Sequence, residues 1–143
     1  TARDDTGMTQ RYFTAEEANE LLAEVRPAVE ELVEHRRALS RVTSEQARLV
    51  TRIAGNGGDF DPQEPRELQE EFQRQAKALG ESVERLERFG VLIKDADRGL
   101  VDFPALRKDG EEVLLCWELG EDEISYWHGL DEGFAGRKPL PLD

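Results

Sequence analysis

A long stripe of apolar residues with heptad spacing is the feature that most limits how this chain can fold. The stripe runs from Ala18 to Ile53 in two registers: Ala18, Val25, Leu32, Leu39 and Ile53 in one, Leu21, Ala28, Val42 and Leu49 in the other. Such spacing is typical of a helix that packs against another helix along its length. The stripe therefore predicts a long, coiled-coil-like helix in the first half of the chain.

Local signals predict where this helix begins, bends and ends. Thr14 and Glu17 have the spacing of a capping box, in which each side chain accepts the other's backbone N–H group. Pro27 lies inside the stripe and predicts a kink or a break, because proline lacks the N–H group of the helical ladder. Thr43 and Gln46 have the spacing of another capping box, so a second break in the helix is allowed at residues 43–46. The glycine-rich run at 55–58 predicts the end of the helix.

A second helix is predicted to follow almost at once. Asp61, Pro62 and Glu64 form a start signal with a second capping box. The apolar stripe of this helix is Leu68, Phe72, Ala76, Leu79, Val83, Leu86 and Phe89. Two long helices joined by a short loop predict an antiparallel hairpin over residues 14–89. Because each helix has more apolar width than one partner covers, we expect two hairpins to form a four-helix bundle in a homodimer.

The pattern changes after Gly90. Short apolar runs predict three strands, at residues 91–94, 100–103 and 113–117. A hairpin turn is predicted at residues 108–110, and a short helix is expected at residues 121–128. Pro104 is expected to end the second strand. Asp102 is expected to face solvent or to cap a turn. The aromatic residues are expected to form a small core between sheet and helices: Phe103, Trp117, Trp127 and Phe134.

The predicted fold class is therefore α+β and mainly α: a long helical hairpin with a small C-terminal antiparallel sheet and loops. Residues 1–10 are predicted to be a flexible arm, and residues 11–143 a single domain. Within that domain the hairpin occupies residues 14–89, and the sheet and loops occupy residues 90–143.

Charge and composition exclude several classes of function. The 143 residues include 32 acidic and 19 basic side chains, a formal charge of −13, which disfavours binding to nucleic acids or anionic membranes. The longest apolar run, 113–117, is far shorter than the ~20 residues of a membrane-spanning helix. The first ten residues lack the pattern of a secretory signal, so we expect a cytoplasmic protein. With one cysteine the chain has no internal disulfide.

Four segments together resemble a known family. They are RYFTAEEANELL at 11–22, KDADRGLVDFPAL at 94–106, LCWELGEDEISYWH at 115–128 and GFAGRKPL at 133–140. In this order they resemble an uncharacterised prokaryotic family known as a domain of unknown function, number 2203. The resemblance implies a single domain and a cytoplasmic setting. It implies no activity and assigns no catalytic residue.

The first candidate site is a metal site near the C-terminal end. His128 and Glu132 are four residues apart, a spacing that would place both on one face of a helix, and Glu123 or Asp131 would add a third ligand. Imidazole with carboxylates suits Zn, Fe(II) or Mn. Gly129 argues against a helix at this point. In the alternative interpretation, His128 anchors a loop through a hydrogen bond to a carboxylate or a carbonyl group.

Two further interpretations concern catalysis and ligand binding. Cys116 would be a nucleophile with His128 as its base, unless the thiol is buried and inert in its apolar strand. Arg137 would bind an anionic ligand, unless it pairs with a neighbouring acid. Tyr12 and Trp127 are the aromatic candidates for the same ligand site, Tyr12 because the hairpin would bring the two ends of the chain together.

Two functional hypotheses remain from the sequence. The first is a homodimeric interaction protein built on the helical hairpin, with a further protein partner possible. The second is a metal- or small-ligand-binding protein with its site around His128, and whether such a protein is an enzyme is left open.

Overall fold

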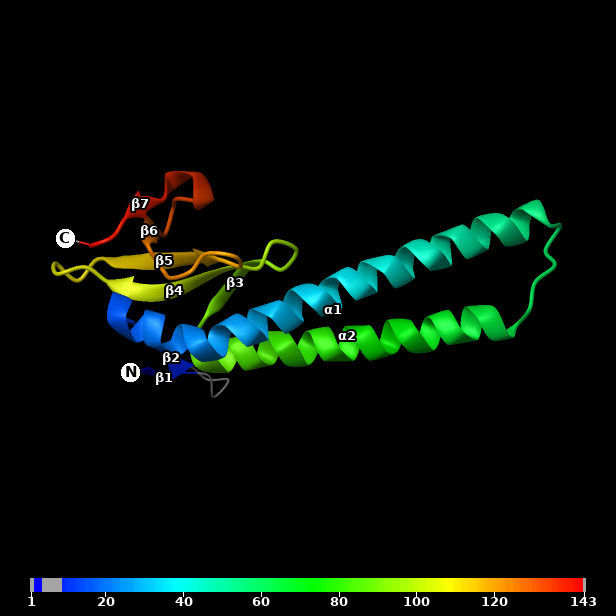
Figure 1. Ribbon diagram of the computed structural model, residues 1–143, viewed down its shortest axis with the longest axis horizontal. Coiled ribbons are helices and arrows are strands. Elements are labelled where there is room, and N and C mark those ends of the chain that lie inside the picture. Colours follow the sequence, from blue (N-terminus) through cyan, green and yellow to red (C-terminus); the bar gives the residue numbers. More distant parts are fainter. Residues whose placement is uncertain (1, 4–8, 143) are drawn as a thin grey trace.

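Two long helices packed side by side carry a small β-sheet at one end (Figure 1). This computed structural model describes residues 2–3 and 9–142. The fold is α+β and mainly α, so the predicted helical hairpin with a C-terminal antiparallel sheet is confirmed. Among the residues that the structure describes, no helix combines the length and the apolar character that crossing a bilayer requires.

Helix α1 (Ala15–Gly55) begins where its sequence predicts. The Thr14 hydroxyl accepts the Glu17 N–H group at 3.0 Å, and the Glu17 carboxylate accepts the Thr14 N–H group at 2.9 Å. The helix runs through Pro27, so the proline does not end it. The second break expected at residues 43–46 is absent: the Thr43 hydroxyl donates to the backbone carbonyl of the preceding turn instead of capping a new helix.

Helix α2 (Gln63–Phe89) begins slightly later than predicted. The Asp61 carboxylate accepts the Gln63 N–H group at 3.0 Å, but no second capping box forms, because Glu64 pairs with Arg52 of α1. The helix ends at Gly90, whose φ of 87° lies in the left-handed region that glycine tolerates. The chain then turns back into the sheet.

The main sheet has five antiparallel strands in sequence order: β3 (Leu92–Asp95), β4 (Leu100–Leu106), β5 (Glu112–Glu118), β6 (Tyr126–Gly129) and β7 (Lys138–Pro139). A 3₁₀ turn, η1 (Phe134–Gly136), precedes β7. Strands β1 (Ala2–Arg3) and β2 (Thr9–Gln10) pair separately. The predicted arm at residues 1–10 otherwise lies outside the described residues.

Two predictions for this sheet are wrong. Strand β4 continues through Pro104, which pairs with Leu114 of β5. The proline is tolerated because β3 has already ended, and the Pro104 carbonyl accepts the Phe13 N–H group on that side at 2.7 Å. The helix predicted at residues 121–128 is instead a loop followed by β6, which pairs with β5.

The two faces of the sheet have different surroundings. One face packs on the helices and contributes seven core residues: Val101, Phe103, Ala105, Val113, Leu115, Trp117 and Trp127. Phe134 does not join this core, so that prediction is wrong for one of the four aromatic residues. The alternate residues of β4, β5 and β6 point to the opposite face, where the segment around η1 lies. The candidate site is on that opposite face.

Candidate metal centre

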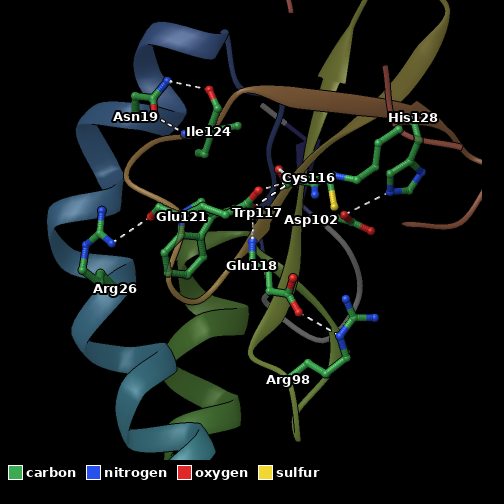
Figure 2. Close-up of polar contacts among 11 residues, drawn as sticks. Asn19, Arg26, Arg98, Asp102, Cys116, Trp117, Glu118, Glu121, Ile124 and His128 are labelled. Atoms are coloured by element: carbon green, nitrogen blue, oxygen red, sulfur yellow. Dashed lines mark hydrogen bonds and ion pairs between the residues drawn. The ribbon is translucent and has the colours of Figure 1, made fainter. Parts of the chain in front are cut away.

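Three buried polar side chains meet on the sheet face that points away from the helices. Asp102 of β4 lies directly opposite Cys116 of β5, and His128 comes from the next strand, β6. Their exposed fractions are 0%, 1% and 3%. One potential ligand atom from each residue lies within 4.8 Å of the others. Figure 2 shows the three side chains converging, with the His128 ring pointing at the Asp102 carboxylate.

The hydrogen bonds of His128 determine where its protons lie. Nδ1 is 2.9 Å from the Gly129 carbonyl oxygen, which only accepts, so Nδ1 carries a proton. Nε2 faces Asp102 Oδ1 at 3.2 Å. In the neutral imidazole Nε2 is an acceptor, and two acceptors repel at this distance. A proton or a metal cation between the two atoms makes the contact favourable.

Asp102 is an acidic side chain in an apolar surrounding. Burial raises the pKa of its carboxyl group above the ordinary value, and the nearby His128 and Lys94 only partly oppose this. The Cys116 thiol contacts the carboxyl group, but Oδ2 is fully buried and has no hydrogen-bond partner among the described residues. The closest cation to it is Lys94 Nζ at 3.9 Å, on a side chain that is 47% exposed. A buried carboxylate oxygen without a hydrogen bond is costly, so its presence requires an explanation.

The surroundings of Cys116 do not favour the nucleophile hypothesis. Burial raises the pKa of its thiol to about 12, and the charge of Asp102 adds to the effect. Both ring nitrogens of His128 already face other groups, one the Gly129 carbonyl and one the Asp102 carboxylate. The imidazole is therefore not placed to take the proton of the thiol, as a Cys–His pair requires.

A cavity of about 180 Å³ opens beside the three side chains. Its lining residues are Lys94, Leu100, Asp102, Cys116, His128, Glu132, Gly133 and Phe134. The residues come from β3 to β6 and from the segment before η1. A further ligand could therefore reach an ion bound by these side chains through the cavity.

The structure separates the three metal ligands predicted from the sequence. His128 belongs to the buried cluster, and Glu132 lines the same cavity. Glu132 Oε1, however, accepts the Gly129 N–H group at 2.8 Å and contacts Lys138 Nζ at 2.5 Å, so this carboxylate ties the loop together. Glu123 is exposed and is neither in the cluster nor in the cavity lining. Because β6 is a strand, the helical spacing behind this prediction does not apply.

The three predicted ligand-binding residues also lie apart. Arg137 binds the Glu121 carboxylate through Nη2 at 2.8 and 2.9 Å, so it pairs with a neighbouring acid as the alternative interpretation expected. Trp127 lies in the core between sheet and helices. Tyr12 is 40% exposed and lines a separate groove that includes Leu142.

Asp102 is the residue that reasoning from the sequence missed. Its strand alternates so that Val101 and Phe103 face the helices, which places Asp102 on the other face. The sequence suggested that this face is wet. In the structure a later segment covers it, and Phe134 from that segment lines the cavity. The alternation of side chains along this strand could be predicted from the sequence, but the segment that covers its second face could not.

Comparisons with known proteins identify a family but no individual relative. A family model described as an uncharacterised conserved protein, DUF2203, matches residues 11–140. A search of curated proteins and a search of solved structures each returned no match. The matched range includes all three residues of the buried cluster.

Proposed function

Because this chain belongs to the uncharacterised conserved family DUF2203, which brings no described activity, we propose its function from geometry: the protein binds one metal ion of the Zn²⁺ type. The ligands are Asp102, Cys116 and His128. The observation that carries the proposal is the buried Oδ2 of Asp102, which lacks a hydrogen bond inside a group of three ligand atoms. A cation held by the Asp102 carboxylate and His128 Nε2 would balance the buried negative charge and remove the repulsion between Nε2 and Oδ1.

The spacing of the ligand atoms supports the proposal. Zn²⁺ bonds of about 2.0–2.1 Å to nitrogen and oxygen place two tetrahedral ligands about 3.3 Å apart. His128 Nε2 and Asp102 Oδ1 are 3.2 Å apart. The Gly129 carbonyl accepts the Nδ1 proton and leaves Nε2 free to bind, which is the usual arrangement of a metal-binding histidine.

The donor set narrows the choice of metal. A thiolate, an imidazole and a carboxylate suit Zn²⁺, whereas Mn²⁺ prefers oxygen ligands. Fe²⁺ remains compatible with the imidazole and the carboxylate. Thiols stay reduced in the cytosol, so a free cysteine used as a ligand is compatible with our proposal that the protein is cytoplasmic.

Elemental analysis tests this proposal on untagged protein purified without chelator. We expect about one equivalent of Zn per chain in the wild type, and loss of it in His128→Ala and in Cys116→Ser. His35→Ala is the matched control, because His35 is the only other histidine and lies on α1, hydrogen-bonded to Gln75 of α2. This control should retain the metal.

A second measurement separates loss of metal from loss of folding. Adding Zn²⁺ to chelator-treated wild type should raise its Tm, because the ion binds only the folded state. His128→Ala should fold, with a circular dichroism spectrum like that of the wild type, and show no such rise. A wild type that takes up no Zn, Fe or Mn and shows no change in Tm would overturn the proposal.

We also propose that the helical hairpin pairs with a second copy of this chain. Of the 27 residues of α2, only Ser82 and Leu86 are buried, and both lie in the two turns next to the sheet. The rest of the helix is therefore only partly covered by α1. Covering this partly exposed stripe with a second hairpin would bury more apolar surface and stabilise the arm.

Charge complementarity supports a second copy as the occupant. A groove of about 440 Å³ lies between the helices near the end far from the sheet, with Leu49 and Leu68 among its lining residues. The other lining residues carry both signs of charge: Glu45, Arg48, Arg52, Glu64 and Glu67. A two-fold axis across this groove would bring arginines of one copy to glutamates of the other. The proposed homodimer is tested below, at the scale of the whole molecule.

A further inference from the structure

The cavity beside the proposed metal centre has a polar end and an apolar wall. Its polar lining side chains are the three proposed ligands, Lys94 of β3 and Glu132. The apolar wall is formed by Leu100 and Phe134. Three protein ligands leave one position of a tetrahedral ion open, as in catalytic rather than structural zinc sites. The following argument rests on the proposed metal site.

Lys94 differs from the other cations at this end of the sheet. Arg98, Arg137 and Lys138 each have a carboxylate partner at 2.9 Å or less, namely Glu118, Glu121 and Glu132. Lys94 has Asp102 at 3.9 Å as the one ion-pair partner that the described part of the chain provides. Its charge is therefore balanced only by a carboxylate that the metal would use.

Charge counting shows what the loaded centre lacks. The Asp102 carboxylate and the metal-bound Cys116 thiolate together neutralise a divalent ion. Glu132 also lines the cavity, and its charge is balanced by Lys138. With its partner neutralised, Lys94 becomes an unpaired cation on the wall of the cavity. A ligand that carries a single negative charge would restore neutrality.

We infer that the metal-loaded protein binds a small monocarboxylate in this cavity. One carboxylate oxygen takes the open position of the ion, and the other lies near the ammonium group of Lys94. The short aliphatic part of the ligand lies against Leu100 and Phe134. The cavity of about 180 Å³ suits a ligand of a few heavy atoms rather than a drug-sized molecule.

Cobalt-loaded protein tests this inference, because Co²⁺ substitutes for Zn²⁺ and its visible spectrum reports its ligands. Acetate is the probe, and acetamide is its uncharged counterpart of the same size. Acetate should change the cobalt spectrum in a saturable manner, and acetamide should not. Lys94→Gln should raise the Kd for acetate about tenfold or more, because the ammonium charge is lost.

Lys77→Gln is the matched control for the lost charge. Lys77 is exposed on α2, outside the residues that line the cavity, and its replacement should leave the acetate Kd unchanged. Lys94→Gln should still take up one equivalent of Co²⁺, since Lys94 is not a ligand in this scheme.

The outcomes distinguish this inference from the metal site itself. A thiolate-to-cobalt charge-transfer band without any response to acetate would overturn the inference and leave the metal site standing. The same holds if Lys94→Gln binds acetate as the wild type does. Failure of the wild type to bind Co²⁺ or Zn²⁺ would overturn both proposals together.

Discussion

At the scale of single residues, Asp102 shows how strongly tertiary context changes the meaning of a side chain. An aspartate between two apolar strand residues usually faces water. Here the carboxylate is 0% exposed and contacts an imidazole. Burying this carboxylate costs free energy, and its interactions with His128 and Lys94 offset only part of that cost. Buried charges of this kind are typical of ligand-binding and catalytic sites.

Gly99 is a residue where the backbone itself sets the requirement. Its φ is +71°, and a Cβ added there would lie 2.8 Å from Leu119 Cβ and 3.0 Å from Val29 Cγ1. We predict that Gly99→Ala lowers the free energy of unfolding by about 1–3 kcal/mol, through backbone strain and the collision with packed side chains. Urea denaturation followed by circular dichroism measures this change.

Gly80 provides the matched control for this substitution. It lies within α2, and a Cβ added there would meet nothing within 4 Å. Gly80→Ala should therefore raise the free energy of unfolding by up to about 1 kcal/mol, because alanine is the better helix former. Equal effects of the two substitutions would contradict this account of Gly99.

Among the elements, the segment from η1 to β7 is held in place by Arg137. The Arg137 guanidinium lies 4.1 Å from the Tyr126 ring centroid and 4.4 Å from that of Phe134. It also pairs with Glu121, and the Arg137 side chain is only 13% exposed. One side chain thus joins η1, β6 and the loop before β6.

We predict that Arg137→Lys loosens this segment while the charge is kept. Lysine lacks the planar guanidinium group that stacks on the two aromatic rings while its Nη2 reaches both oxygens of Glu121. The free energy of unfolding should fall by about 1–2 kcal/mol. Hydrogen exchange should become faster at the Leu140 N–H group, which donates to the Ser125 carbonyl.

Arg74→Lys is the comparison for this variant. Arg74 pairs with Glu71 on the exposed side of α2, where its side chain is 65% exposed. Pairs of this kind contribute little, so the free energy of unfolding should change by less than about 0.5 kcal/mol. Slow Leu140 exchange in Arg137→Lys would show that Arg137 does not hold the segment.

At the scale of the whole molecule, the sheet and the helical arm differ in how well they are buried. Helix α1 alone is about 60 Å long at ~1.5 Å per residue, so most of the hairpin projects beyond the sheet (Figure 1). At the projecting end Val50 is 68% exposed and Phe60 is 46% exposed. These apolar groups lie near the groove of mixed charge.

We predict that the wild type sediments as a dimer with twice the 16.2 kDa mass of the chain. Val50→Glu should produce the monomer, since it places a charge beside the groove without touching the monomer core. Sedimentation velocity at several concentrations measures both effects.

Leu130→Glu is the control for this experiment. Leu130 is 54% exposed but lies after β6, at the sheet end of the molecule, and its variant should remain a dimer. A wild type that is monomeric at every concentration, or a Val50→Glu variant that remains dimeric, would rule out the proposed pairing of the hairpins.

Elements whose signals are local could be predicted from the amino-acid sequence. The capping box at Thr14 and Glu17, the heptad stripe and the left-handed Gly90 define the helical hairpin through contacts within a few residues along the chain. The same holds for the hairpin turn before β5, where Gly110 has a φ of 87°. Local hydrogen bonding and periodicity are enough to set such features.

The residues that meet in the candidate site could not be predicted in this way, because their contacts depend on how the strands pair. His128 was a candidate from its residue type, but Asp102 lies 26 positions earlier and joins it only because β4, β5 and β6 pair in order. Pro104 lacks an N–H group, but the pairing of β3 with β4 extends only to Asp102, so no hydrogen bond between these strands is lost. Strand register and the segment that covers a face depend on contacts distant in sequence, which local patterns do not encode.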